Sequence, residues 1–599
     1  MGAPGLRSPG ARAAARDQTL DRGQAGNGGT PVKLRIGTRG SDLALWQARH
    51  IAALLAPERP CELVVLKTRG DLIDDVPLQS VEGKAFFTGE IERALLDGEV
   101  DLAVHSHKDL PTEMTPGLSI AAVPERASMR ERLLIRPECW NEPGAFLPLA
   151  RGAKVGTSSP RRAEQLALLR PDLAIADLRG NVPTRVKRLR EGRYDAIVLA
   201  AAGLDRLDLD LSGLKDVELP LEWFVPAPAQ GALAIQIREQ DQELRALLER
   251  RLHRPECARA VAAERGLLAR AGGGCNLPLG ASVLGVGPYR AVVFLGADHP
   301  APGARARWAA AEAGTPEAAA DLAFAALLRG GTRHGPLAGL RVALCGSARA
   351  TAELAARLSD LGADVGREEL ITFEQIPAPK LQEQAAGLVP GDALAVTSRE
   401  AARRLGGLKL APGVELAAVG QATAAELRAV GLEPTWIGEQ GAAQLGRLLN
   451  CRPGATVLFP CAEETVGDLE RELSARGVSV VNLPLYRTTT RPGATRMARP
   501  DVRIFLSPSS VRATRQFARD SDAARVITLG LRTQEACLSA GWTAECAADS
   551  HVESALALLA PRASAAPPPS DRTPSDRTPP DRPPSGATPR LRAPTPPRS

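Results

Sequence analysis

Short apolar runs alternate with helix-like patterns along most of this chain, and this alternation constrains the fold more than any other feature. The runs KLRIGT, ELVVLKT and DLAVHS are interleaved with helical patterns such as LALWQARHIAALL and FTGEIERALLDGEV. Buried parallel strands joined by crossover helices produce this order. We therefore predict an α/β fold with the strands inside and the helices outside.

A second stretch of the same kind begins near residue 340. The runs LRVALCGS, ALAVTS, ELAAVG, TVLFP and RIFLSPSS are each followed by an alanine-rich helical pattern. The segments VGQATAAELRAVGLEPTW and LGLRTQEACLSAGWTAEC are similar to each other, which indicates two related halves. TRHGPLAG separates the two stretches, and its glycine and proline predict a short linker at 331–337. A chain of 599 residues should form roughly four folded units at about 150 residues each.

The net charge of +6 comes from the two ends of the chain. Residues 1–30 carry four Arg and two Asp, and residues 561–599 carry seven Arg and three Asp, so residues 31–560 are balanced. This distribution argues against nucleic-acid binding by the folded part. Both ends have too few apolar residues to offset the entropy of ordering, and we expect disordered tails. The SDRTP repeat of the second tail fits either a docking segment or a solubilising tail.

The apolar residues and cysteines bear on location. Hydrophobic residues make up 44% of the chain, yet no apolar run approaches the roughly 20 residues of a membrane-spanning helix. The N-terminus lacks the apolar core of a secretory signal. Nine cysteines without a CxxC pair indicate reduced thiols. We expect a cytoplasmic protein with no membrane partner.

The first chemical signal is HSHKDLP at 105–111, directly after an apolar run. In α/β folds the carboxyl end of a strand is where ligand-binding residues gather. Asp109, beside Lys108, could orient and protonate a substrate amine there, or could cap a turn before Pro111. His105 and His107 lack a third ligand at suitable spacing, so we expect no metal.

A second signal is a set of arginines in turns rich in Gly, Ser and Thr: TRGSDLALWQ, TRGD, GTSSPRR and RGNVPTR. Guanidinium groups bind carboxylates and phosphates bidentately, and these turns predict a polyanionic ligand of either kind. A third signal is GGGC at 272–275. Glycines around a thiol suit an exposed attachment point, although a free cysteine is more often a small buried side chain.

Nine motifs in this order resemble the porphobilinogen deaminase family, also called hydroxymethylbilane synthase, over about residues 32–330. They are TRGSDLALWQ, TRGD, GKAFF, HSHKDLP, GTSSPRR, RGNVPTR, AAGLDR, PAPAQGALAIQ and GGGC. The resemblance implies two periplasmic-binding-protein-like domains and a small α/β domain that carries the cysteine. It places them at 31–125, completed by a return of the chain near 220–240, at 126–219 and at 241–330.

The same resemblance implies the cofactor and the site. One dipyrromethane per chain would be attached covalently to Cys275. Asp109, with Lys108, would assist the loss of ammonia from porphobilinogen. The acetate and propionate groups of cofactor and substrate would be bound by Arg39, Ser41, Lys84, Ser106, Thr157, Ser159, Arg161, Arg162, Arg179, Arg185 and Arg206.

Residues 338–560 resemble uroporphyrinogen-III synthase, through pieces such as VTSREAARRL, FLSPSSVRATRQF and LGLRTQEACLSAGW. This implies two α/β domains joined by a β ladder, and ring closure of a bilane with inversion of its last ring. The implied candidates are Thr423, Tyr486, Ser507, Ser509 and Thr533. Tyr486 would assist departure of the terminal hydroxyl, whereas a helix N-cap is the alternative role for each hydroxyl.

Two turns of this region, CGSAR at 345–349 and FPCAEE at 459–464, lack arginines that are common in the family. Carboxylate binding by backbone amides, or reduced activity, would follow. The leading hypothesis is a monomeric bifunctional enzyme that makes hydroxymethylbilane from porphobilinogen and passes it to a neighbouring site. A regulatory C-terminal region without synthase activity, or a solute-binding module that leaves Cys275 unexplained, are the alternatives.

Overall fold

The computed structural model describes residues 33–67, 88–141, 146–273, 277–296, 308–329, 334–438, 441–465, 467–515, 524–547 and 552–559. Cys275 and Lys84 lie outside these residues, as do the two tails. Four sheets organise the described chain: two of five strands, one of three and one of ten. The predicted α/β class is confirmed.

The first lobe is built on a five-stranded sheet of order β2-β1-β3-β10-β4, in which β10 is antiparallel to its neighbours β3 and β4. Most apolar residues of its inner strands are buried because helices and the rest of the lobe cover them. Its strands are β1 (Leu34–Arg39), β2 (Cys61–Leu66), β3 (Leu102–Ser106), β4 (Leu118–Ala122) and β10 (Leu233–Arg238), and its helices are α1 (Asp42–Leu55), α2 (Gly89–Leu96) and α6 (Gln242–Leu252).

The end of the first lobe lies further along the chain than the sequence-based boundary at 241. Leu248 and Leu252 of α6 are fully or almost fully buried in the same apolar cluster as Ile36 and Leu102. The helix therefore covers the first sheet, and the third domain begins after it. The apolar pattern of α6 shows that one face is buried, but not against which sheet.

The second lobe repeats this plan with the sheet order β7-β6-β8-β5-β9, where β5 is antiparallel to β8 and β9. Its strands are β5 (Glu131–Ile135), β6 (Lys154–Gly156), β7 (Ala174–Ala176), β8 (Ala196–Ala200) and β9 (Lys215–Leu219), and its helices are α3 (Pro160–Leu169), α4 (Val182–Arg190) and α5 (Ala201–Leu207). Two segments, 123–130 and 220–232, run between the lobes, so the chain crosses twice.

The third domain is a small antiparallel sheet covered by two helices. It consists of β11 (Leu279–Leu284), β12 (Tyr289–Leu295), β13 (Trp308–Ala313), α7 (Pro255–Arg270) and α8 (Pro316–Arg329). Leu267 of α7 and Leu327 of α8 are fully buried against the sheet. Glu264 of α7 is also buried, and it binds Arg126 of the first crossing segment through two contacts of 2.8 Å. The third domain is thereby tied to the hinge region between the lobes.

The C-terminal region forms one ten-stranded sheet that passes through two lobes. Strands β15 and β20 pair antiparallel from Ile371–Thr490 to Gln375–Tyr486 and join the lobes as a ladder. One lobe holds β14 (Arg341–Ser347), β15 (Asp364–Gln375), β21 (Val502–Phe505), β22 (Arg525–Thr528), β23 (Glu545–Cys546), α9 (Ala348–Asp360), α15 (Pro508–Arg515), α16 (Leu531–Ser539) and α17 (Val552–Leu559). The other holds β16 (Ala393–Val396), β17 (Glu415–Val419), β18 (Trp436–Gly438), β19 (Thr456–Ala462), β20 (Ser479–Thr490), α10 (Leu381–Ala386), α11 (Arg399–Arg403), α12 (Gly420–Ala429), α13 (Gly441–Leu448) and α14 (Asp468–Ser474).

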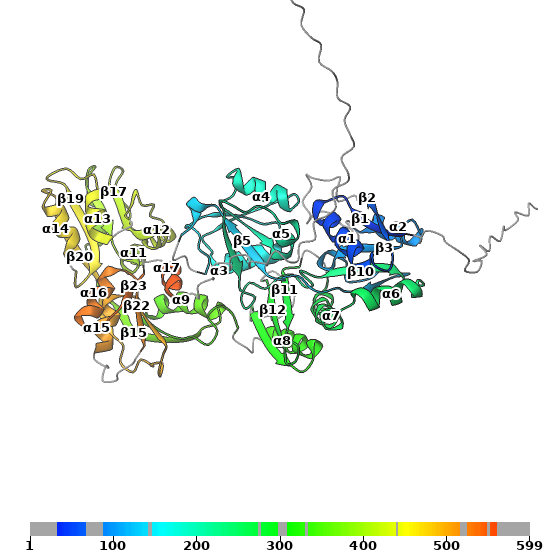
Figure 1. The fold of residues 1–599 in the computed structure, drawn as a ribbon. Helices are drawn as coiled ribbons and strands as arrows, with labels where there is room; N and C mark the ends of the chain where they lie inside the picture. The colour runs from blue at the N-terminus through cyan, green and yellow to red at the C-terminus, as the bar shows by residue number, and fades with distance from the viewer. Residues whose placement is uncertain are drawn as a thin grey trace, which may run out of the picture.

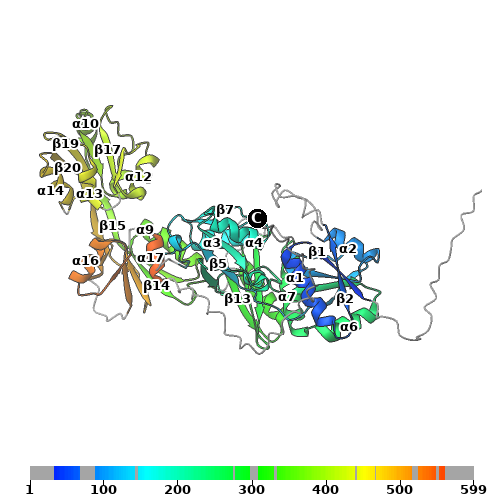
Figure 2. The same cartoon turned by 45° about the horizontal axis from the view of Figure 1, so that its top comes forward.

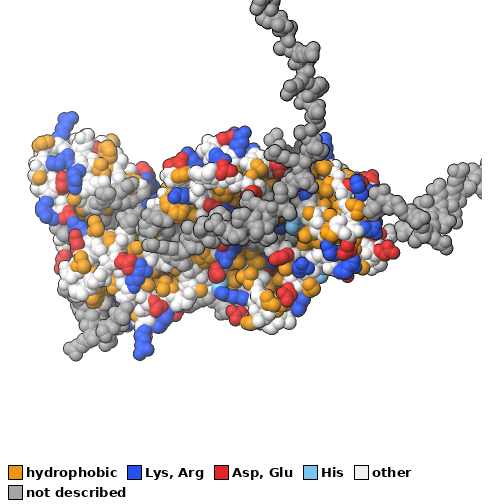
Figure 3. All heavy atoms as spheres, in the orientation of Figure 1, with side chains coloured by type: hydrophobic (Ala, Val, Ile, Leu, Met, Phe, Trp, Pro, Cys, Tyr) orange, Lys and Arg blue, Asp and Glu red, His pale blue; other side chains and the backbone are white. Residues whose placement is uncertain are grey.

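Figures 1 and 2 show the parts in a row: the first lobe, then the second lobe with the third domain beside it, then the C-terminal region. On the face in Figure 3 basic and acidic side chains are interspersed, in keeping with the balanced charge of residues 31–560. Among the described helices, none has the length and apolar character needed to span a bilayer.

Candidate active sites

Asp109 lies in a single 3₁₀ turn, η3 (His107–Asp109), at the carboxyl end of β3. Its side chain is exposed, whereas the neighbouring Lys108 is half-buried. The Lys108 ammonium donates to Oε1 of Gln230 at 3.1 Å, and Gln230 belongs to the second crossing segment. Burial lowers the pKa of Lys108, and the charge of Asp109 opposes that shift. A carboxylate open to solvent and a cation therefore lie side by side at the edge of the first sheet.

Two buried histidines lie at this turn, His105 on β3 before it and His107 as its first residue. Burial lowers the pKa of His105 to about 4 and that of His107 to about 3, with Arg265 also lowering the latter. A ring nitrogen of His105 hydrogen-bonds Oε1 of Gln236 at 2.9 Å. Both rings are therefore neutral near pH 7. Within the described ranges, no group of three His, Cys, Asp or Glu side chains could hold a metal ion.

Helix α7 of the third domain is hydrogen-bonded to the Asp109 turn through Arg265. The Arg265 guanidinium donates to the carbonyl oxygens of His107 at 2.9 Å and Leu110 at 3.1 Å, and also to that of Pro111. At Gly273, beyond the end of α7, a Cβ atom would lie 3.0 Å from Oγ1 of Thr112. The chain that leads to Cys275 thus starts next to the turn that carries Asp109.

A buried ion-pair cluster lies at the start of α3. The Glu131 carboxylate accepts from Arg161 at 2.8 Å and from Arg162 at 2.7 Å. The same arginines donate to backbone oxygens, Arg161 to Val225 at 2.8 Å and Arg162 to Val198 at 3.1 Å. Burial alone would raise the pKa of Glu131, but Arg162 and Arg161 hold it down to about 2. Two buried cations share one carboxylate, so the cluster carries a net positive charge.

The other predicted arginines of the second lobe follow its parallel strands. Arg179 donates to Asp177 at 3.0 Å, and Arg185 donates to the Gly180 carbonyl at 2.7 Å. The pKa of Arg185 falls to about 10, first through burial and then through the charge of Arg162. Arg162 also acts on the pKa of Lys108. The structure therefore brings Lys108 of the first lobe into the electrostatic reach of this arginine group.

Arg206 lies where the two lobes touch. It donates to the Gly231 carbonyl at 2.7 Å, and its guanidinium carbon lies 5.7 Å from the centroid of the Trp46 ring on α1. Burial lowers its pKa to about 10. Stacking on an aromatic ring restrains a guanidinium while its edge still donates. Arg206 therefore bridges the two lobes.

The remaining predicted residues are found at strand ends and helix starts. Ser41 Oγ caps α1 by accepting from the Ala44 amide at 3.4 Å, two residues after Arg39. Ser106 Oγ accepts from Gln47 at 2.9 Å, and Thr157 Oγ1 accepts from the Ser159 amide at 3.2 Å. Their contacts within the protein do not test ligand binding, so their roles stay predictions. Sequence reasoning missed Gln230, Glu131 and Arg265, although Gln230 lies within the PAPAQGALAIQ motif.

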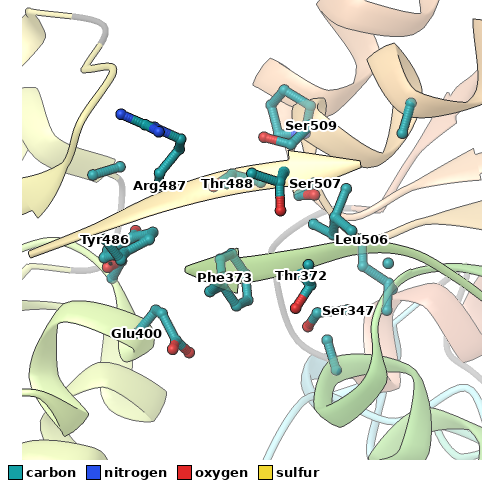
Figure 4. A pocket seen from close by; sticks show the side chains of 18 of the residues that line it. Ser347, Thr372, Phe373, Glu400, Tyr486, Arg487, Thr488, Leu506, Ser507 and Ser509 are labelled. Carbon is teal, nitrogen blue, oxygen red and sulfur yellow. Dashed lines mark hydrogen bonds between the residues drawn. The ribbon is translucent and has the colours of Figure 1, made fainter. Parts of the chain in front are cut away.

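The C-terminal region has its own cavity, of about 1310 Å³, between its two lobes around the β15–β20 ladder. Figure 4 shows side chains from the ladder and from both lobes around it. The FPCAEE turn contributes no arginine, but the lining includes Arg349 of the CGSAR turn together with Arg399, Arg403, Arg487, Arg491 and Arg512 from other segments. Several are paired, for example Arg403 with Glu426 at 2.9 Å and Arg487 with Glu463. The two turns themselves contribute one arginine, and carboxylate binding there by backbone amides, or reduced activity, stays a prediction.

Tyr486 of β20 lines this cavity with its hydroxyl 3.0 Å from Oγ of Ser398. Its ring packs edge-on against Phe373, with centroids 5.5 Å apart, and the Arg404 guanidinium lies 5.2 Å from its centroid. Burial raises the pKa of the phenol, and the hydrogen bond to Ser398 opposes that shift. A neutral phenol can donate a proton into the cavity.

The other predicted hydroxyls divide into two groups. Ser507 and Ser509 line the cavity, and Ser507 Oγ accepts from the Ser510 amide at 3.2 Å in the manner of a helix cap. Thr423 and Thr533 are 4% and 3% exposed, and neither lines this cavity. Ser398, which sequence reasoning missed, caps α11 by accepting from the Ala401 amide at 3.0 Å. A serine before a helical pattern was the available signal.

The N-terminal half is thus a two-lobed, arginine-rich α/β protein with a third domain held against the inter-lobe turn. Residues 34–246 match the family model described as porphobilinogen deaminase, dipyromethane cofactor binding domain. The porphobilinogen deaminase of Nitratidesulfovibrio vulgaris (strain DSM 19637 / Miyazaki F) is 49% identical over 250 residues, which are 41% of this chain and 76% of that protein. That of Syntrophomonas wolfei is 49% identical over 249 residues, 41% of this chain and 79% of that protein. The chain belongs to the porphobilinogen deaminase family.

The C-terminal half matches a second family. Residues 352–557 match the model described as uroporphyrinogen-III synthase HemD. The mutant uroporphyrinogen III synthase of Thermus thermophilus is 22% identical, covering 36% of this chain and 96% of that one, with a TM-score of 0.28. Both predicted families are confirmed, in the predicted order.

Proposed function

We propose that the chain polymerises porphobilinogen to hydroxymethylbilane in its N-terminal half and closes the bilane to uroporphyrinogen III in its C-terminal half. The two family matches support the pair of activities. The observation that carries the first activity is the exposed Asp109, whose turn is bound by α7 and lies next to Gly273, where the chain leads on to Cys275. The observation that carries the second is an arginine-lined cavity that contains the Tyr486 hydroxyl.

Asp109 would act on the substrate as it loses ammonia. The C–N bond of the aminomethyl group breaks, ammonia leaves, and the pyrrole becomes an electron-poor azafulvene. A carboxylate next to the pyrrole nitrogen stabilises the developing positive charge more than it stabilises the neutral substrate. Lys108, held by Gln230 at 3.1 Å, would bind a substrate carboxylate next to Asp109.

The residues fit a dipyrromethane, a group with several carboxylates. The second lobe concentrates arginine at its strand ends, with Arg162, Arg179 and Arg185 coupled electrostatically. We propose that Cys275 holds the group through a thioether and that these arginines bind its carboxylates. When bound, the group would supply the free α-carbon that attacks the substrate, with loss of the α-proton afterwards. The match to a dipyromethane cofactor binding domain supports this choice of cofactor.

Tyr486 would serve the ring closure. Departure of the terminal hydroxyl of the bilane requires a proton, so that the group leaves as water, and the neutral phenol can supply it. The arginines around the cavity would bind the acetate and propionate groups of the folded bilane. Ser398 keeps the phenol oriented by its hydrogen bond of 3.0 Å.

A monomeric cytoplasmic protein with domains near the expected boundaries is part of this proposal. All eight cysteines of the described ranges are free thiols, which suits a reducing compartment. A regulatory C-terminal region without activity would leave the Tyr486 cavity unexplained. A solute-binding module would not explain why Gly273, which follows α7 and precedes Cys275, lies next to the Asp109 turn.

Product-isomer analysis tests the two activities together. Purified chain incubated with porphobilinogen should give uroporphyrinogen III. Production of the spontaneously closed symmetric isomer alone would remove the second activity and keep the first. Intact mass should show an adduct on the parent chain that is lost in Cys275→Ser, and an unmodified parent chain would overturn the attachment.

A further inference from the structure

Trp308 of β13 connects the third domain to the second lobe. Its side chain is fully buried, and its ring lies 5.5 Å, centroid to centroid, from Phe294 of β12. The indole nitrogen donates to the backbone oxygen of Trp223 at 3.0 Å, in the second crossing segment. A buried indole N–H needs such a partner, so the position of the ring is defined on both sides.

The first described residues after the third domain pack directly on this tryptophan. At Gly335 a Cβ atom would lie 3.3 Å from Cε3 of Trp308 and 2.6 Å from the carbonyl oxygen of Leu361. Leu361 follows α9 of the C-terminal region. Gly335 therefore fills a gap between the deaminase half and the synthase half that no larger residue fits. The positive φ of 144° at this position also favours glycine.

Hydrogen bonds and apolar packing complete this contact. A ring nitrogen of His334 donates to the Glu222 carbonyl at 3.1 Å, and the Leu337 amide donates to the Leu361 carbonyl at 2.9 Å. Leu337 is 3% exposed and belongs to one continuous apolar cluster. That cluster runs from the second lobe through Trp308 to the core of the C-terminal lobe that holds β14 and α9, here called the first synthase lobe. An apolar interior shared in this way is typical of a single packed unit.

We propose that residues 334–337, Trp308 and the end of α9 form a docking joint that holds the first synthase lobe against the deaminase half. In Figures 1 and 2, α9 and α17 lie next to the second deaminase lobe, as the joint requires. The second synthase lobe is connected through the β15–β20 ladder and lies away from the joint. The joint is independent of either activity, because it contains none of the side chains proposed to act on substrate.

The joint can be tested in the full-length protein by cutting the chain beside it. A site for a specific protease, with flexible flanks, is inserted after Gly331, and cleavage is followed by gel filtration in high salt. The two fragments should elute together at the volume of the uncut chain, because the joint and not the linker holds them. Separation of the parent fragments would overturn the proposal.

Two variants and a matched control locate the contact. Gly335→Val places methyl groups against the Leu361 carbonyl and Trp308, and Leu337→Asp places a charge in the apolar cluster. Each should make the cleaved fragments elute separately, while porphobilinogen consumption before cleavage stays within about twofold of the parent. Gly314→Val is the control, because a Cβ there meets nothing within 4 Å, and its fragments should stay together. Co-elution in all three variants would place the contact elsewhere and overturn the proposal.

Discussion

Burial decides which side chains around Asp109 carry charge. His105 and His107 have pKa values of about 4 and about 3 and are neutral at physiological pH. The positive charge next to Asp109 therefore comes from Lys108 and from the arginines of the second lobe. In HSHKDLP the three basic side chains look alike, and only their depth in the fold separates the structural histidines from the lysine.

Glu131 should be a main determinant of the stability of the second lobe. Glu131→Gln leaves Arg161 and Arg162 buried without their counter-charge, which should cost about 3 to 5 kcal/mol of unfolding free energy. The folded-state pKa of about 2 lies below the ordinary value of 4.5, so the stabilisation is present above pH 4.5. It should be lost as the pH falls from 4.5 toward 2. Denaturant unfolding at several pH values measures both effects.

The matched control is Glu218→Gln on β9. Glu218 pairs with Arg130 at 3.2 Å while about a third of its side chain is exposed. Its loss should cost less than about 1 kcal/mol, because a partly exposed pair gains little from its attraction. Equal losses for the two variants would contradict a special role for the buried cluster.

Tyr486→Phe should abolish most of the second activity and leave the first intact. Without a proton donor for the departing hydroxyl, the closing step should slow by roughly 10²- to 10⁴-fold. The product should then shift to the symmetric isomer at an unchanged rate of porphobilinogen consumption. Ser398→Ala removes only the hydrogen bond of 3.0 Å and should give an intermediate isomer ratio. A wild-type ratio in Tyr486→Phe would exclude the phenol as the donor.

The candidate residues of the deaminase half could be named from the sequence because they lie in compact motifs at strand ends. The partners of those residues could not, since they come from distant segments. Glu131 lies 30 residues before Arg161, and Gln230 lies 122 residues after Lys108. Nothing local in the sequence marks such pairs. In the synthase half, the arginines of the cavity come from several elements, so no single sequence motif predicts them.

Helix α7 links the Asp109 turn to the point where the chain leads on to Cys275, the proposed cofactor attachment. Its Glu264 accepts from the amides of Ala229 at 2.7 Å and Val283 at 2.8 Å, and its Arg265 holds three carbonyl groups of the turn. These bonds saturate backbone groups that would otherwise be buried without partners. One helix, α7, therefore determines where the Asp109 turn lies relative to the chain that follows the helix.

Arg265→Met should lower the turnover of porphobilinogen while leaving the fold and the covalent adduct in place. Methionine keeps the apolar stem but frees three carbonyl groups, so the Asp109 turn loses its fixed position. We expect kcat to fall at least tenfold with an unchanged intact mass of the adduct-bearing chain. Arg259→Met on the same helix is the control, because Arg259 is half-exposed and pairs with Glu317 at 3.2 Å on the surface. A similar loss in both variants would point to a general effect on α7.

The elements themselves follow from the sequence to different degrees. Apolar runs such as DLAV and AIVLA correspond to the strands β3 and β8. Strand β15 is different, because DVGREELITFEQ contains five charged residues and its burial pattern changes along its length. It leaves one lobe and enters the other, so neither face is buried throughout. A strand that links two cores shows no simple apolar pattern, and the ladder was expected only from the family resemblance.

In the whole molecule, the docking joint determines how the two active sites are related. The proposed deaminase site lies between the first and second lobes, and the cavity that contains Tyr486 lies within the C-terminal region. Figures 1 and 2 place the second lobe between them. The expected transfer of the bilane between neighbouring sites stays a prediction.

Transfer through solvent has a measurable consequence in mixtures of two inactive chains. Cys275→Ser should make no bilane but retain its synthase cavity, whereas Tyr486→Phe combined with Arg487→Glu should make bilane and not close it correctly. Alone, the first should give no product and the second mainly the symmetric isomer. Mixed in equal amounts, they should restore uroporphyrinogen III to nearly the fraction made by the parent, since released bilane reaches either chain by diffusion. If the mixture gave only the symmetric isomer while the parent made uroporphyrinogen III, the bilane would have to pass within one chain, and a route around the second lobe would be needed that keeps it bound to the protein.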